Sequence, residues 1–128
     1  MIVLDAGVLI AYLDRNDVQH DRAEALLAEE IDDDFAANVL TLAEVLVAPA
    51  RERRLDAARE ALDDLEVKEL PFPVDSAVKL AQLRAATNLR MPDCCVLLAA
   101  EGAQARVASF DARLNQAAIS RNVAVLSR

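Results

Sequence analysis

The sequence of 128 residues contains no tryptophan, and aromatic residues make up only 3% of it. Since hydrophobic residues nevertheless account for 55%, the core must be aliphatic, built from Leu, Val, Ile and Ala. That composition favours helices packed on a buried sheet over an aromatic-rich β-sandwich. The length is typical of one domain with one core, so we expect a single domain over residues 1–128.

The sequence also lacks any apolar run near the ~18 residues that a helix needs to cross a bilayer. Its apolar start, MIVLDAGVLIAYL, carries no basic leader and is interrupted by Asp5. A signal peptide is therefore not expected. We predict a cytoplasmic protein without a membrane partner.

Cysteine and histidine, which are common zinc ligands, are scarce in this sequence. The two cysteines, Cys94 and Cys95, are adjacent, so they cannot brace distant segments, and two thiols alone make a poor zinc site. We expect them to be small buried hydrophobes. His20 is the single histidine, and we expect it to have a packing or capping role.

Positive charge is in deficit, because 22 acidic residues outnumber 14 basic ones and leave a formal net charge of −8. This excludes a protein whose whole surface attracts nucleic acid, although local basic contacts remain possible. The densest basic group is RERR, residues 51–54, which either holds an RNA backbone or forms the solvated face of a helix.

Apolar segments with the two periods of regular structure alternate along the whole chain. We predict strands at residues 2–4, 35–39, 67–70, 106–110 and 123–126, and helices at residues 7–13, 18–30, 41–48, 53–65, 74–86, 92–101 and 111–120. Such alternation indicates an α/β fold, a single three-layer domain with a central, mostly parallel five-stranded sheet flanked by helices.

Acidic residues follow two of the predicted strands. Asp5 comes directly after the first strand, and Asp111 comes directly after the fourth. Ligands gather at the carboxyl ends of the strands in such sheets. Either residue could instead serve only as an N-cap, and Asp93, which follows Pro92 in a first helical turn, could serve only the helix dipole.

Glu44 interrupts the otherwise apolar stretch VLTLAEVLVAPA, residues 39–50. An unpaired carboxylate on a buried face would cost several kcal/mol or become protonated. The alternative is that its face is exposed to solvent. No Lys or Arg adjoins Glu44, Asp5 or Asp93 in sequence, so a cluster of these acids needs another counterion, and hard oxygen ligands select Mg²⁺ or Mn²⁺. Phosphoryl transfer is the chemistry that uses such a cluster.

Four motifs, MIVLDAGVLIAYLD, TLAEVLVAP, MPDCCVLLAA and ASFDARL, occur in an order that resembles the PIN-domain nucleases, and within them the VapC toxins. The resemblance runs from Met1 to the C-terminus. It implies that Asp5, Glu44, Asp93 and Asp111 are the catalytic residues and bind Mg²⁺ or Mn²⁺. It also implies an endoribonuclease with a five-stranded parallel sheet, acting on RNA, and a homodimer held inactive by a VapB-type antitoxin.

The chain departs from that family at Gly7, where Ser, Thr or Asn is common, so a hydrogen bond beside the metal site is lost or supplied by water. Asn115 is the polar candidate where relatives carry a further acid, unless it is an ordinary surface residue. Thr41 could bond to the Glu44 carboxylate or cap its helix. Ser109 shares a strand face with Asp111, and Arg113 is our first candidate for a substrate phosphate.

Two other functions are compatible with the sequence. A haloacid-dehalogenase-like phosphatase also begins with a strand ending in Asp, but it usually carries a second Asp where this chain has Gly7, and only Lys68 and Lys79 could supply its lysine. A non-catalytic PIN-like domain that only binds a partner would retain the acids as remnants.

Overall fold

In the computed structural model, which describes residues 1–126, four short strands form one parallel sheet in the order β3-β2-β1-β4. The strands are β1 (Ile2–Leu4), β2 (Phe35–Asn38), β3 (Lys68–Leu70) and β4 (Arg106–Ala108). Val3 of the central strand β1 is paired with Ala36 of β2 and Val107 of β4. The predicted parallel α/β architecture is confirmed.

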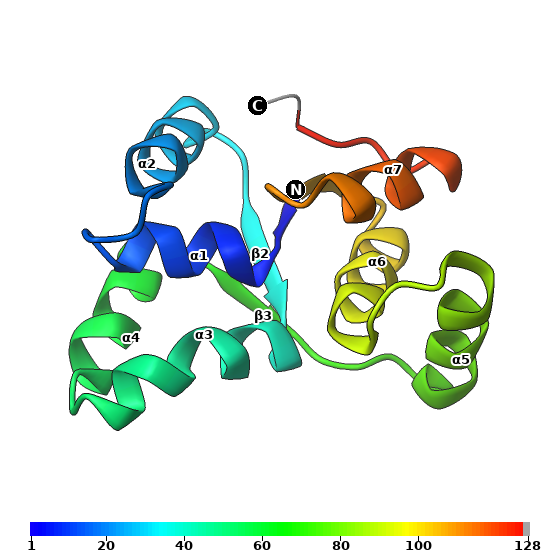
Figure 1. Cartoon of the computed structure of the whole chain (residues 1–128), viewed down its shortest axis with the longest axis horizontal. Coiled ribbons are helices and arrows are strands. Elements are labelled where there is room, and N and C mark those ends of the chain that lie inside the picture. The colour runs from blue at the N-terminus through cyan, green and yellow to red at the C-terminus, as the bar shows by residue number, and fades with distance from the viewer. Residues whose placement is uncertain (127–128) are drawn as a thin grey trace.

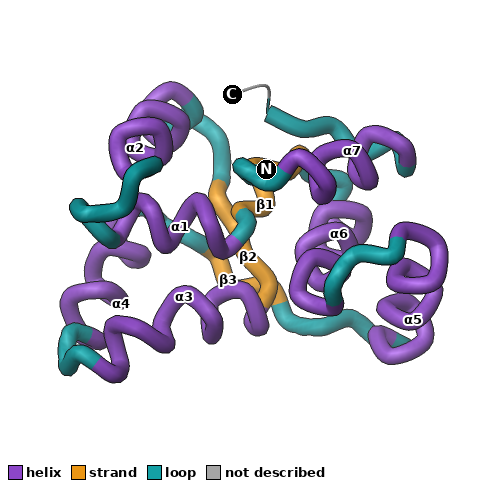
Figure 2. Tube along the Cα trace, viewed as in Figure 1, coloured by secondary structure: helices purple, strands orange, loops and turns teal. Residues whose placement is uncertain are grey.

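Helices cover both faces of the sheet, as Figures 1 and 2 show. Successive side chains of a strand point to opposite faces. Val3 accordingly joins the apolar cluster built with α5, α6 and α7, whereas Ile2 and Leu4 join the cluster built with α1 to α4. The helices are α1 (Ala6–Leu13), α2 (His20–Glu29), α3 (Val39–Arg51), α4 (Leu55–Asp64), α5 (Ser76–Thr87), α6 (Met91–Ala103) and α7 (Ala112–Ser120).

The predicted fifth strand is wrong within the described residues. Residues 123–126 run beside β4, but they form only an isolated parallel bridge between Val107 and Val125. The chain leaves α7 through a tight turn in which Asn122 has a positive φ of 63°. Both hydrogen bonds that the segment then makes with β4 use Val107 alone, so the contact is too short to be a strand.

Three helix ends differ from the sequence prediction. The Asn38 side chain caps α3 by accepting from the Leu40 N–H, so Thr41 lies inside the helix and does not cap it. Pro49 also lies inside α3, which continues to Arg51. Helix α6 continues past Gly102 and ends at Ala103, and its C-cap residue Gln104 adopts the left-handed conformation. No helix within residues 1–126 combines the length and apolarity needed to cross a bilayer.

The strand order reverses at β1, because later strands are added on both of its sides. The chain proceeds from β1 to β2 on one side, and β4 returns to the other side of β1. The crevice at the carboxyl ends of such neighbouring strands is where open α/β sheets hold ligands. Residues that follow β1, β2 and β4 are therefore brought to the same edge of the sheet.

Candidate acidic site

A cavity of about 460 Å³ lies at this edge, and all four predicted acids line it. They come from four separate segments: the end of β1, helix α3, the first turn of α6 and the turn between β4 and α7. The complete lining is Asp5, Ala6, Gly7, Ile10, Asp17, Gln19, Glu44, Arg90, Pro92, Asp93, Phe110 and Asp111. The fold thus brings the four acids to one cavity.

Asp5 is held by two hydrogen bonds. Its Oδ1 accepts from the Ala6 N–H at 2.8 Å, which caps α1, and its Oδ2 accepts from the Ser109 hydroxyl at 2.7 Å. Burial raises the pKa of Asp5, and the nearby charge of Asp111 adds to the rise, whereas these two hydrogen bonds oppose it. The folded protein therefore holds this carboxylate in a position where its charge is costly.

Ser109 links two of the acids. Its side chain is buried, with 3% of the residue exposed, and its oxygen also accepts from the Asp111 N–H at 2.9 Å. The Asn115 side chain donates to the Ser109 carbonyl at 3.0 Å, so Asn115 is a half-buried brace rather than an ordinary surface residue. The hydroxyl and the amide together fix the turn that carries Asp111.

Asp111 both caps a helix and lines the cavity. Its Oδ1 caps α7 by accepting from the N–H groups of Arg113 and Leu114, at 2.9 and 3.4 Å. The same residue lines the cavity. Asp5 does likewise at the start of α1, so capping and exposure to the cavity coexist at both strand ends.

Asp93 lies in the first turn of α6 and is only 7% exposed. Burial raises its pKa most strongly, and the neighbouring charges of Asp5 and Asp111 raise it further. Arg90 opposes this rise; its Nε lies 3.8 Å from Asp93 Oδ2. The partial positive charge at a helix N-terminus also favours the ionised carboxylate.

Glu44 is exposed, which corrects the interpretation that its helix face is buried. Its neighbours Leu42 and Val45 face the core instead, and Val47 is exposed on the same helix. The Glu44 carboxyl lines the edge of the cavity. Partial desolvation there raises its pKa, the charges of Asp5 and Asp93 raise it further, and Arg90 lowers it.

Arg90 is the positive charge that the sequence reasoning missed. It is the one basic side chain in the cavity lining given above, and it lowers the pKa of Asp5, Glu44 and Asp93. A search for basic residues directly adjacent to the acids passes over it. Its place three residues before Asp93, across a helix start, is the signal that could have found it.

The remaining candidates lie around the cavity rather than in its lining. Thr41 is buried one helical turn before Glu44, and Arg113 is exposed beside Asp111. Gly7 does line the cavity, and a Cβ added there would meet no atom within 4 Å. The departure at Gly7 therefore leaves open space where a small polar side chain would fit.

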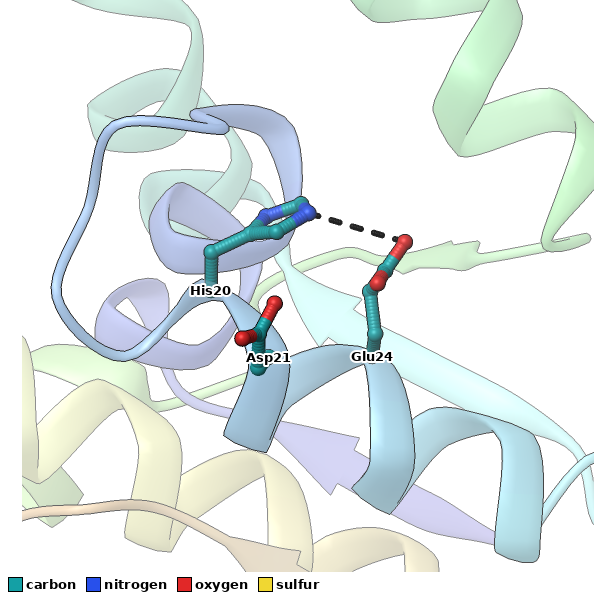
Figure 3. Close-up of side chains that lie close together, drawn as sticks. All are labelled: His20, Asp21 and Glu24. Carbon is teal, nitrogen blue, oxygen red and sulfur yellow. Dashed lines mark ion pairs between the residues drawn. The ribbon is translucent and has the colours of Figure 1, made fainter.

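The donor set of the cavity is made of carboxylate oxygens, which suits a hard divalent cation. As placed, however, its acids are spread more widely than the ligands of one ion. Within residues 1–126, the one group of three metal-ligand atoms within 4.8 Å of one another is an imidazole nitrogen of His20 with carboxylate oxygens of Asp21 and Glu24 (Figure 3).

His20 has a structural role, as predicted. Its Nδ1 donates to the Ala11 carbonyl at 2.8 Å and so ties α2 to α1. Its Nε2 lies 3.5 Å from Glu24, the pair joined by the dashed line in Figure 3. His20 does not line the acidic cavity.

A second, larger hollow of about 650 Å³ adjoins the acidic cavity. It lies between the end of α1, helix α3 and helix α4, and its lining is divided between apolar and charged side chains. Ile10 and Glu44 line both spaces. A ligand lying in this groove would therefore reach the edge of the acidic site.

Residues 2–120 match the family model described as the PIN domain. No match was found among curated protein sequences. Solved structures do match. FitAcB from Neisseria gonorrhoeae superposes with a TM-score of 0.74 at 23% identity, over 99% of this chain and 97% of that one.

Two further solved structures match over most of the chain. VapC20 from Mycobacterium tuberculosis, a sarcin-ricin loop cleaving toxin, has a TM-score of 0.76 at 16% identity, over 91% of this chain and 95% of that one. VapBC2 from Rickettsia felis, bound to a DNA fragment from their promoter, has a TM-score of 0.74 at 13% identity, over 98% of each chain. At such low identity these likenesses show the fold.

Proposed function

Because the chain belongs to the PIN-domain family, we propose that it is a Mg²⁺- or Mn²⁺-dependent endoribonuclease and the toxin of a VapBC-type toxin–antitoxin pair. The observation that carries the proposal is the convergence of Asp5, Glu44, Asp93 and Asp111 on one cavity. The likeness to a toxin that cleaves the sarcin-ricin loop supports RNA as the substrate.

The residues fit a divalent cation by the chemistry of their donors and by their need for positive charge. Three carboxylates, those of Asp5, Glu44 and Asp93, have a pKa raised by burial and by the charges of neighbouring acids, so a cation among them would relieve a cost already present in the fold. A bound Mg²⁺ or Mn²⁺ supplies Lewis acidity, which activates water and neutralises charge on a phosphate.

The roles of the chain's own residues follow from their positions. Asp5, Asp93 and Asp111 stand on strand ends or a helix start, are tied by backbone or hydroxyl hydrogen bonds or by burial, and would hold the cation. Glu44 is exposed at the cavity edge, where it would bind the cation directly or through water and accept a proton from the attacking water. Ser109 and Asn115 position these groups through their hydrogen bonds. Thr41, buried one helical turn before Glu44, would bond to the Glu44 carboxylate, and Arg113 would approach the substrate.

Asparagine variants test this function. Asp5→Asn and Asp93→Asn should abolish Mg²⁺-dependent cleavage of RNA while the circular dichroism spectrum stays unchanged, because each variant removes an anionic ligand and preserves its shape. Asp64→Asn, at an exposed acid of α4, is the matched control and should retain activity. Full activity in either cavity variant would remove the proposed site.

We also propose a VapB-type antitoxin as partner. The likeness to FitAcB and to VapBC2 supports it, and the groove beside Glu44 offers a place for an antitoxin segment. Co-expression with a cognate VapB-type antitoxin should give a stable complex that no longer cleaves RNA. An active complex, or no complex, would argue against this partner.

A homodimer is the proposed assembly of the toxin. Apolar side chains are exposed on and near α5, namely Phe72, Val74, Val78 and Met91. Such a group favours a protein interface. Light scattering should give twice the mass of one chain, and Val78→Glu should reduce it to one; a monomeric wild-type protein would contradict the assembly.

The two alternatives gain little from the structure. Lys68 and Lys79, which a phosphatase of the haloacid-dehalogenase type would need, are exposed and do not line the cavity. A covalent aspartyl-phosphate trapped on Asp5 would nevertheless favour that chemistry. A pure binding module is distinguished by calorimetry, because it should show no stoichiometric Mn²⁺ site.

A further inference from the structure

The acidic cavity has a large imbalance of charge. Five carboxylates line it, those of the four proposed ligand residues and of Asp17, against the single guanidinium of Arg90. An RNA phosphate entering this space meets like charge on almost every side. A positively charged side chain in the cavity lining, such as Arg90, therefore has a strong influence on whether the substrate binds.

Arg90 is held in the cavity only loosely. It is the N-cap residue of α6, its backbone is extended, and its side chain is 78% exposed. Its Nε lies 3.8 Å from Asp93 Oδ2, which is too long for a hydrogen bond. By contrast, Arg106 and Arg121 bind carboxylates through hydrogen bonds of 3.0 and 2.6 Å. The Arg90 guanidinium is thus available for a stronger partner.

A phosphate is such a partner. The planar guanidinium presents several N–H donors in a fork that matches two phosphate oxygens, and hydrogen bonds between charged groups are short and strong. Arg113, the candidate chosen from the sequence, is exposed but does not line the cavity. Arg90 is therefore better placed than Arg113 to meet a phosphate at the acids.

We propose that Arg90 exchanges partners during the reaction: it pairs with the cavity carboxylates in the free protein and binds a non-bridging oxygen of the scissile phosphate in the RNA complex. This assignment rests on the proposed nuclease function and makes Arg90 a catalytic residue. The exchange follows from competition, because Asp93 cannot serve both a divalent cation and the guanidinium equally well.

The exchange predicts effects of opposite sign on two ligands. Arg90→Gln removes a cation that competes for the acids, so Mn²⁺ should bind more tightly, by a few-fold. The same change removes a phosphate contact, so RNA should bind about 10- to 100-fold more weakly. The slope of log Kd for RNA against log salt concentration should also decrease by about 0.7 to 1, because one phosphate contact is lost.

The experiment measures Mn²⁺ binding by calorimetry and binding of a labelled single-stranded RNA by fluorescence anisotropy in Ca²⁺, with a gel to verify that the RNA stays intact. Arg90→Lys retains the charge but loses the fork, so it should keep the wild-type Mn²⁺ affinity and lose part of the RNA affinity. Arg59→Gln, at an exposed position of α4, is the matched control and should leave both unchanged.

The outcomes separate the two proposals. Weaker RNA binding with tighter Mn²⁺ binding in Arg90→Gln supports the exchange. The exchange is overturned if Arg90→Gln binds RNA within two-fold of the wild type, or if it binds both RNA and Mn²⁺ more weakly. Either result counts whether or not the variant's unfolding temperature has changed. If the wild-type protein itself binds no Mn²⁺ and cleaves no RNA, the proposed function fails instead.

Discussion

Replacing Ser109 by alanine removes a hydroxyl that makes two hydrogen bonds in a buried position. The hydroxyl donates to the Asp5 carboxylate at 2.7 Å and accepts from the Asp111 N–H at 2.9 Å. A hydrogen bond to a charged group contributes about 1.5–3 kcal/mol, and a neutral one about 0.5–1.5 kcal/mol. Because water in the cavity can replace part of this, we expect Ser109→Ala to lower the free energy of unfolding by about 2 kcal/mol.

The loss should depend on pH in a defined direction. The Ser109 hydrogen bond favours ionised Asp5 and so opposes the rise that burial causes in the pKa of Asp5. Without it, the folded protein binds a proton at Asp5 at higher pH than before. The destabilisation should therefore be complete above the pKa of Asp5 in the folded variant. It should shrink as pH falls from there to the lower pKa of Asp5 in the folded wild type.

Urea unfolding followed by far-UV circular dichroism is the suitable assay, because the chain has no tryptophan. For a chain of this length, 2 kcal/mol corresponds to a fall of about 7–8 °C in Tm. Ser120→Ala, at the exposed end of α7, is the control and should change stability by less than about 0.5 kcal/mol. A Ser109→Ala loss as small as that of the control, or one that is the same at all pH values, would refute the reasoning.

Three further predictions concern residues with separate physical roles. Asp5→Asn should raise the unfolding free energy in metal-free buffer by about 0.5–2 kcal/mol, because the raised pKa makes ionised Asp5 destabilising above that pKa; urea unfolding near neutral pH checks it, and a loss of stability would contradict it. Asp33 is paired with the Met1 ammonium at 2.8 Å and with Arg106, which lower its pKa from 3.8 to about 2, so it stabilises the fold above pH 3.8 and loses this effect as pH falls through about 2. Tm measured across that range should fall less steeply in Asp33→Asn than in the wild type, whereas an equal slope would count against the pairing. Gly7→Ser should stabilise α1 by up to about 1 kcal/mol, since a Cβ there meets open space and serine loses less backbone entropy; calorimetric Tm would show the opposite sign if the site were crowded.

The positions of the acids could be predicted because local rules determine them. Asp5 and Asp111 follow apolar strands, and parallel strands bring their carboxyl ends to one edge. The interruption of an apolar helix singled out Glu44. The exposure of Glu44 could not be predicted, because α3 is apolar on most sides and the face that packs on the core depends on its neighbours in the fold. Those neighbours leave Val47 exposed as well.

The contacts between distant segments escaped the sequence analysis. The hydroxyl of Ser109 meets Asp5 across 104 residues, and the ring of His20 meets the Ala11 carbonyl of another helix. Arg90 was missed because its role depends on three acids that only the fold brings near. The fifth strand failed for a similar reason: apolar residues 123–126 suit a strand, but the turn before them leaves room for one bridge.

Anomalous diffraction from crystals soaked in Mn²⁺ tests the central claim most directly. The account predicts a manganese peak in the acidic cavity, with oxygens of Asp5 and Asp93 within about 2.0–2.3 Å of it, and loss of that peak in Asp5→Asn. A peak only beside His20, Asp21 and Glu24, with none among the cavity acids, would contradict it.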